Sequence, residues 1–111
     1  MLPTLTSGAV VVQQVMTTNT NNVGALCFRN TGGKIYAAFT IAMPKKWDEG
    51  TLTYKVYWTI NSTSANSAVF GLQAVATSNN DVLDVAYGTA QEVTDSGLGT
   101  TIYKTHVSPE S

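Results

Sequence analysis

Apolar and polar residues alternate along two segments, residues 35–43 and 51–60. In the first, one face carries Ile35, Ala37, Phe39, Ile41 and Met43, and the other carries Tyr36, Ala38, Thr40 and Ala42. In the second, one face carries Leu52, Tyr54, Val56, Trp58 and Ile60, and the other carries Thr51, Thr53, Lys55, Tyr57 and Thr59. A period of two predicts half-buried strands. The connection contains Pro44, and Gly50 can turn at positive φ, so we expect an antiparallel pair.

Shorter segments predict further strands at residues 8–15, 23–28, 68–77, 90–94 and 101–107. Polar or glycine-containing turns separate them at residues 17–22, 30–33, 61–67 and 95–99. Gly71, inside a strand, predicts a bulge or a close backbone approach. About seven short strands with frequent turns favour an all-β fold, an antiparallel β-sandwich of the jelly-roll type.

The expected organisation is one structural domain. Residues 1–30 form an N-terminal arm and the first strands, with residues 1–7 irregular, and residues 31–111 form the β-sandwich. A chain of 111 residues has room for one domain of ordinary size.

Residues 78–87 depart from the alternation. The segment 81–86 predicts one short helical turn, which Ser78, Asn79 or Asn80 can cap. An oxygen-rich cluster in the same region comprises Asn79, Asn80, Asp81 and Asp84. Calcium takes six to eight oxygen ligands, but the spacing lacks the glycine and terminal glutamate of an EF-hand. We therefore prefer capping and turn chemistry to a calcium site, and we expect no metal and no cofactor.

Charged residues make up 12% of the chain, about half the usual share of roughly 25%. Threonine, asparagine and serine supply the polarity instead, a composition typical of surfaces that pack against neighbours. The net charge of −1, with dispersed cations, argues against nucleic-acid binding. No apolar run has the length of a membrane helix, and the first residues do not form a signal peptide, so we expect intracellular synthesis and no membrane contact.

Two residues with reactive side chains occur once each, Cys27 and His106. Cys27 is predicted to be a small buried hydrophobe in a strand, without an intrachain disulfide. Nothing in the sequence places a nucleophile or an orienting acid beside His106, and one cysteine with one histidine is too few for a zinc site. We expect no enzymatic activity.

The aromatic residues divide into a core group and an exposed group. Tyr54 and Trp58 share the apolar face of their segment and are predicted to lie in the core. Tyr36 and Tyr57 fall on the opposite faces, and Trp47 lies in the connection, where it either covers the sandwich as a lid or stands exposed. Exposed flat rings stack on sugars, so Tyr36, Trp47 and Tyr57 are candidates for carbohydrate binding. Contact with another subunit is an equally good interpretation.

Five segments carry a resemblance to a known family: residues 43–53, 57–59, 71–76, 81–91 and 107–111, with the sequences MPKKWDEGTLT, YWT, GLQAVA, DVLDVAYGTAQ and VSPES. In their order and spacing, residues 36–111 resemble a β-sandwich domain of structural proteins from tailed bacteriophages, including capsid, tail-fibre and decoration proteins. Members of this family usually continue with further strands beyond the segment VSPES. The resemblance therefore implies that a partner supplies these strands or that the sequence is a fragment, and that one sheet edge is unpaired.

The resemblance implies a structural virion protein, either a capsid decoration protein or a head-fibre component, made in the host cytoplasm. It carries no catalytic residues. Its partners would be other copies of the chain, with a trimer favoured, and capsid or other virion proteins. The alternative function is a receptor- or carbohydrate-binding module of a tail fibre, with a host surface glycan as the ligand.

Overall fold

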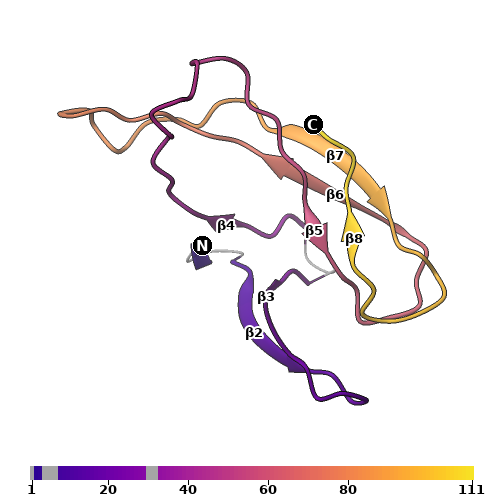
Figure 1. Cartoon of the computed structure of the whole chain (residues 1–111). Coiled ribbons are helices and arrows are strands. Elements are labelled where there is room, and N and C mark those ends of the chain that lie inside the picture. Colours follow the sequence, from indigo (N-terminus) through magenta and orange to yellow (C-terminus); the bar gives the residue numbers. More distant parts are fainter. Residues whose placement is uncertain (1, 4–7, 30–32) are drawn as a thin grey trace. The chain divides into compact units, whose positions relative to one another are not determined.

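The computed structural model describes residues 2–3, 8–29 and 33–111. Within these ranges the protein is all-β and has no helix. The strands are β1 (Leu2–Pro3), β2 (Val10–Val15), β3 (Asn22–Cys27), β4 (Ala37–Ala38), β5 (Tyr57–Trp58), β6 (Ser67–Leu72), β7 (Gln91–Ser96) and β8 (His106–Val107). They form four two-stranded antiparallel sheets, β1–β4, β2–β3, β5–β8 and β6–β7 (Figure 1). The all-β prediction is confirmed.

The chain forms two compact units, Met1–Asp48 and Glu49–Ser111. The division falls inside the predicted connection between the two alternating segments. β4 pairs with β1, and β5 pairs with β8, so the predicted pairing of residues 35–43 with 51–60 is wrong. Alternation reports that a segment is extended, but it contains no information about which segment hydrogen-bonds to it.

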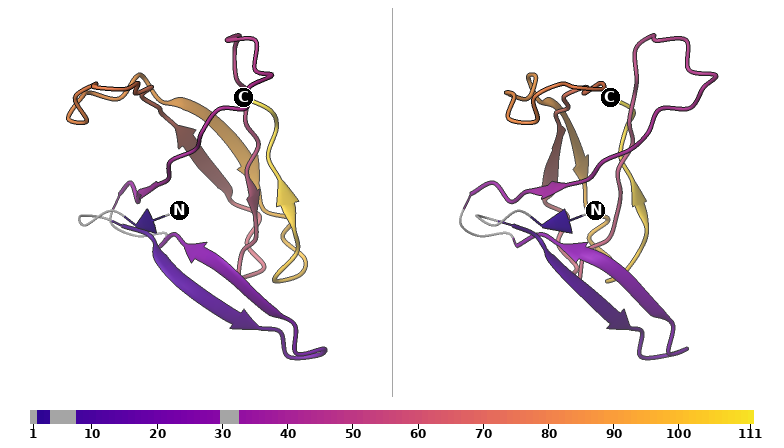
Figure 2. Two further views of the ribbon diagram at one scale, coloured as in Figure 1. Left: turned by 60° about the vertical axis from the view of Figure 1, so that its left-hand side comes forward. Right: turned by 90° about the vertical axis from the view of Figure 1, so that its left-hand side faces the viewer.

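The first unit contains a regular hairpin of β2 and β3, which lie side by side in both views of Figure 2. The register runs without interruption from Val10 opposite Cys27 to Val15 opposite Asn22. A hydrogen bond from Met16 N to Asn21 O, 2.7 Å long, closes the loop. The predicted strands at 8–15 and 23–28 are therefore confirmed to within about two residues.

At the other end of β2 the backbone meets the segment that leads into β4. Gly8 forms a parallel bridge with Tyr36, and Ala9 N donates to Tyr36 O at 2.9 Å. Ala9 is 2% exposed. β1 belongs to the arm that was predicted to be irregular, so part of this arm is paired. The rest of the arm (1, 4–7), and residues 30–32, which include the predicted boundary between arm and sandwich and most of the predicted turn, lie outside the described residues.

The first alternating segment is much shorter as a strand than predicted. Beyond β4 no strand continues, and Phe39, Ile41 and Met43 are exposed. The turn that follows has Trp47 N donating to Pro44 O at 3.0 Å. Glu49, and not the glycine after it, has the positive φ of 62°.

In the second unit, residues 54–60 lie antiparallel to residues 103–111. Tyr54 and Ser111 exchange backbone hydrogen bonds of 2.8 and 3.0 Å, and Tyr103 N donates to Ile60 O at 2.9 Å. Between these contacts β5 pairs with β8. The final residues of the sequence therefore supply a neighbour for the second alternating segment.

The faces of this second segment agree with the prediction. Tyr54, Val56, Trp58 and Ile60 are half-buried, and Lys55, Tyr57 and Thr59 are exposed. Leu52, at the start of the segment, is the exception, since 59% of it is exposed. The period of two thus identified the inward face of this segment correctly, although it did not identify the pairing partner.

The long strands β6 and β7 form the other sheet of the second unit (Figure 1). Ala68, Phe70 and Leu72 of β6 are half-buried, and Val93, opposite Phe70, is 8% exposed. Gly71 lies opposite Glu92 in an unbroken register, so the predicted bulge is wrong. A Cβ at Gly71 would lie 3.5 Å from Glu92 Cγ, an ordinary contact. The remainder of the predicted strand, residues 73–77, is not a strand.

Residues 78–87 contain a turn at 78–81 and no helix, so the predicted helical turn is wrong. Asp81 N donates to Ser78 O at 3.1 Å, and the Asp81 carboxylate accepts a 2.7 Å hydrogen bond from Ser78 N. Asn80 has a φ of 70°. Asparagine tolerates this left-handed conformation, which ends helical geometry and favours a tight turn.

The turn after β7 closes against the segment before β6. The predicted turn covered residues 95–99, but β7 continues through Ser96. Gly97 is buried and donates from its N–H to Asn66 O at 3.1 Å. A Cβ at Gly97 would collide with Ser64 O, so the close approach requires glycine here.

Candidate functional site

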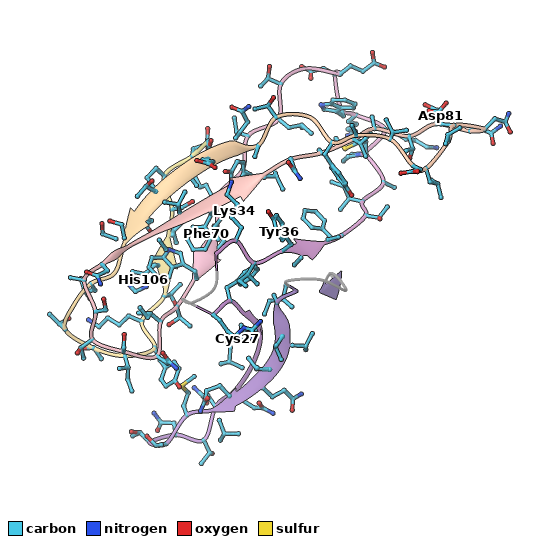
Figure 3. All side chains as sticks on the ribbon, turned by 180° about the vertical axis from the view of Figure 1, so that it is seen from behind. Cys27, Lys34, Tyr36, Phe70, Asp81 and His106 are labelled. Atoms are coloured by element: carbon cyan, nitrogen blue, oxygen red, sulfur yellow. The ribbon has the colours of Figure 1, made fainter. Side chains whose placement is uncertain are left out.

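Trp58 is the centre of the side-chain packing that the structure describes in the second unit. The centroid of its ring lies 5.5 Å from the centroid of the Phe70 ring. The Trp58 ring is also stacked on the His106 ring, with centroids 4.4 Å apart and 25° between the two ring planes. Its indole N–H donates to Asp95 Oδ2 at 2.8 Å. Four segments therefore meet at one half-buried tryptophan, in agreement with its predicted place in the core (Figure 3 labels Phe70 and His106).

His106 is part of this packing. Leu98 N donates to His106 Nε2 at 3.1 Å, so Nε2 acts as the acceptor. Nδ1 is buried and has no hydrogen-bond partner within the described residues. Because the accepting nitrogen is already bound to the backbone, the geometry assigns the ring to holding the 97–99 turn and the Trp58 stack.

Tyr54 connects the same segment to the β6–β7 sheet. Its hydroxyl lies 3.3 Å from Phe70 O and also within hydrogen-bonding reach of Gln91 O. The ring is half-buried, as predicted for the apolar face of the segment. Tyr54 and Trp58 together make polar as well as apolar contacts with β6 and β7.

The oxygen-rich cluster is built as a turn. The Asp81 carboxylate binds Ser78 N, and Figure 3 shows Asp81 far along the loop from Phe70 and His106. Across the described ranges, no group of three or more histidine, cysteine or acidic residues is arranged to hold a metal ion. The observed hydrogen bonds agree with the turn interpretation, whereas the helix-capping part of it is wrong.

The three candidate sugar-stacking residues are exposed: Tyr36 by 45%, Trp47 by 37% and Tyr57 by 73%. Tyr36 and Trp47 belong to the first unit, and Tyr57 belongs to the second. Their combination into one binding surface, and the role of Trp47 as a lid, therefore stay predictions. Tyr57 lies opposite Val107, which is also exposed.

Cys27 is exposed at the end of β3 (Figure 3), so its predicted burial is wrong. The pattern 23–28 is apolar and predicts a strand correctly, but five of the six residues of β3 are exposed. Cys27, a small apolar residue in an apolar segment, therefore lies at the surface.

Exposed apolar side chains are the feature that sequence reasoning missed. Among the described residues, the buried apolar residues are only Ala9 and Val93. Twenty large hydrophobic residues in the described part of the chain are exposed, including Val10, Val11 and Val15 of β2, and Val82, Leu83, Val85 and Tyr87 of the loop before β7. For β2 the low charge of the sequence was the signal, because no charged residue flanks this strand.

Comparison of the chain with known protein families, with curated proteins and with solved structures finds no match. The described residues contain no helix with the length and apolar character needed to cross a membrane.

Proposed function

We propose that the chain is a non-enzymatic structural subunit of a tailed-bacteriophage particle, as a capsid decoration protein or a head-fibre component. Its location is the virion, and its partners are other copies of the chain and the proteins of the shell. The phage assignment rests on the sequence resemblance of residues 36–111. The assembling role rests on the exposed apolar side chains.

One observation carries the assembling role. Large apolar side chains are exposed on β2, on β3 and on the loop 82–87, while only two apolar residues are buried in the part of the chain that the structure describes. Burial of apolar surface is the dominant favourable term in folding and association. A chain that leaves such residues exposed gains stability by burying them against other subunits.

The sandwich architecture is part of the proposal. Within the second unit, Trp58 of β5 contacts Phe70 of β6 and bonds to Asp95 of β7, which supports packing of the β5–β8 sheet on the β6–β7 sheet. In a sandwich the inward faces of two sheets interdigitate in this way. Further strands from other subunits would extend both sheets in the particle.

The test is recovery of the chain with intact particles of the virus that encodes it. We expect the tagged chain to sediment with purified capsids and to appear in mass spectra of the particle in a fixed ratio to the shell protein. A chain that stays in the supernatant, with mass spectra that lack it, contradicts the proposal. A trimer is the favoured assembly on the resemblance alone, and light scattering measures it.

The alternative function is a carbohydrate-binding module of a tail fibre. The exposure of Tyr57, at 73%, favours it, because an exposed flat ring can stack on a sugar. A glycan array probed with the purified chain tests this function. Binding that Tyr57→Ala abolishes, while Thr59→Ala on the same face retains it, would favour the alternative.

A further inference from the structure

The hairpin β2–β3 lies in a stretch without charged side chains, because no Asp, Glu, Lys, Arg or His precedes Arg29. Its register is continuous, and neither strand contains a proline or a bulge. Folded proteins normally protect an open strand edge with charges, prolines, bulges or a very short strand. The six-residue strand β2 has none of these devices, and β3 is its only ladder partner within the described residues.

The phase of the ladder shows which backbone groups face the open edge of β2. Met16 N donates to Asn21 O, so this pair is a hydrogen-bonded one. Hydrogen-bonded and non-hydrogen-bonded pairs alternate along an antiparallel ladder, so every second residue of β2 turns its N–H and C=O away from β3. The residues with outward backbone groups are Val11, Gln13 and Val15.

Ala9 confirms this phase independently. It has the same parity as the outward residues, and its N–H donates to Tyr36 O on the side away from β3. Tyr36 therefore occupies the edge beside Ala9, and the open part of the edge begins at Val10. Within that part, the Gln14 side-chain amide donates to Val15 O at 3.1 Å, an exposed contact that an added strand would replace.

The open edge of β2 is self-complementary. Two copies related by a two-fold axis must oppose outward residues to outward residues. An axis at Gln13 meets this condition and pairs all three outward residues of β2, whereas an axis at Val12 or Gln14 leaves one of them unpaired. Val11 then lies opposite Val15 of the second copy, and Val15 lies opposite Val11. These side chains share one face of the strand, with Val11 64% and Val15 51% exposed. Cross-strand pairs of β-branched residues stabilise a sheet, and the two glutamine amides can bond to each other.

The open edge of β3 lacks this complementarity. The same construction places Gly24 on the axis and opposes Leu26 to Asn22 of the second copy. An apolar side chain would face an amide at both ends of that ladder. β2 is therefore the better edge for self-pairing.

We propose that β2 pairs antiparallel with β2 of a second copy of the chain, about a two-fold axis at Gln13. The product is a four-stranded sheet in the order β3–β2–β2–β3. This inference rests on the proposed function, because it names the surface through which the structural subunit assembles. A two-fold contact joins subunits in pairs, so an assembly that contains it has an even number of copies. The trimer favoured on the resemblance is compatible with this contact only as one half of a pair of trimers.

Disulfide cross-linking tests the register. A hydrogen-bonded antiparallel pair has Cα atoms about 5.5 Å apart, within the roughly 4.4–6.8 Å that a disulfide spans. In a Cys27→Ser background, we expect Gln13→Cys to give a covalent dimer on mild oxidation. Val12→Cys is the matched control. In the proposed register Val12 lies opposite Gln14 of the second copy, so the two Val12 positions are offset by two residues and should not form a disulfide with each other. Mixing Val12→Cys with Gln14→Cys chains should restore the cross-link.

Charge substitutions test the same contact without oxidation. Gln13→Lys brings two lysines together at the axis, and like charges directly opposite each other destabilise a sheet. We expect self-association to weaken at least tenfold by light scattering, whereas Gln14→Lys, which adds the same charge opposite Val12, has a much smaller effect. An equimolar mixture of Gln13→Lys and Gln13→Glu should regain wild-type association. Amide hydrogen exchange of β2 and β3 shows whether each variant still forms the hairpin.

Three results would overturn the inference: equal cross-linking by Gln13→Cys and Val12→Cys, equal effects of the two lysine substitutions, or a trimer as the sole species in solution. Failure of the proposed function is a separate result. If the Gln13→Cys dimer forms and the chain does not sediment with capsids, the contact stands and the virion role fails. If wild type sediments with capsids and Gln13→Cys does not cross-link, only the β2 contact fails.

Discussion

The indole N–H of Trp58 donates to the carboxylate of Asp95 across 2.8 Å, although the two residues are 37 positions apart in the sequence. The bond joins β5 to β7. It also orients the ring that contacts Phe70 and His106. The sequence places Asp95 in a turn and predicts no partner for its side chain. Only the tertiary structure reveals its contact with Trp58.

Substitution of Asp95 tests the contribution of this bond. Asp95→Ala leaves the indole N–H without its acceptor and should reduce the free energy of unfolding by about 1–2 kcal/mol. Asp95→Asn keeps a carbonyl oxygen at the same place and should cost less. Urea unfolding followed by tryptophan fluorescence measures both. Equal losses for the two variants would show that the hydrogen bond does not matter to stability.

Trp58→Ala should destabilise the protein far more than Thr59→Ala. Removal of a large ring from a fully buried site costs about 3–5 kcal/mol, and because Trp58 is half-buried we expect the lower end, about 3 kcal/mol. Thr59 is exposed on the opposite face and donates to Lys104 O at 2.7 Å, so its truncation should cost about 1 kcal/mol or less. Thermal or urea unfolding followed by circular dichroism compares them. Similar losses would contradict the assignment of faces.

Gly97→Ala should be strongly destabilising. An added Cβ would collide with Ser64 O, and the backbone must move to relieve the contact, at a cost of about 1–3 kcal/mol. Gly88→Ala is the control, because a Cβ there meets Ala74 O at an ordinary 3.5 Å. Melting temperatures of the two variants should differ by several degrees. If Gly97→Ala melts together with Gly88→Ala, the close approach is not part of the folded protein in solution.

The turn at residues 78–81 should not depend on a metal ion. Asp81→Ala removes the acceptor of Ser78 N and should accelerate amide exchange at Ser78, with a loss of about 0.5–1 kcal/mol. Asp84→Ala, in the same cluster, should leave that amide unchanged. A chelator should leave the melting temperature of the wild type unaltered. Loss of several degrees on chelation would favour the calcium interpretation instead.

Local sequence patterns determined the all-β class, the strands β2, β3 and β7 to within two residues, the start of β6, and the inward face of residues 54–60. Each depends on steric and solvation preferences that act between neighbours along the chain, such as the alternation of side chains on an extended backbone. The same local patterns wrongly predicted a helical turn at residues 81–86. The preceding residue, Asn80, adopts a left-handed conformation and forms a turn instead.

Only the tertiary structure decided which strands pair and which apolar residues stay exposed. β5 pairs with β8, which lies far away in the sequence, and Cys27 lies at the surface although the sequence predicts that it is buried. Pairing and burial depend on contacts between segments that are distant in sequence, and alternation is the same for every possible partner. The low charge of the sequence favours an assembling protein, and the ladder phase of β2, which is a tertiary observation, is what the proposed self-pairing edge depends on.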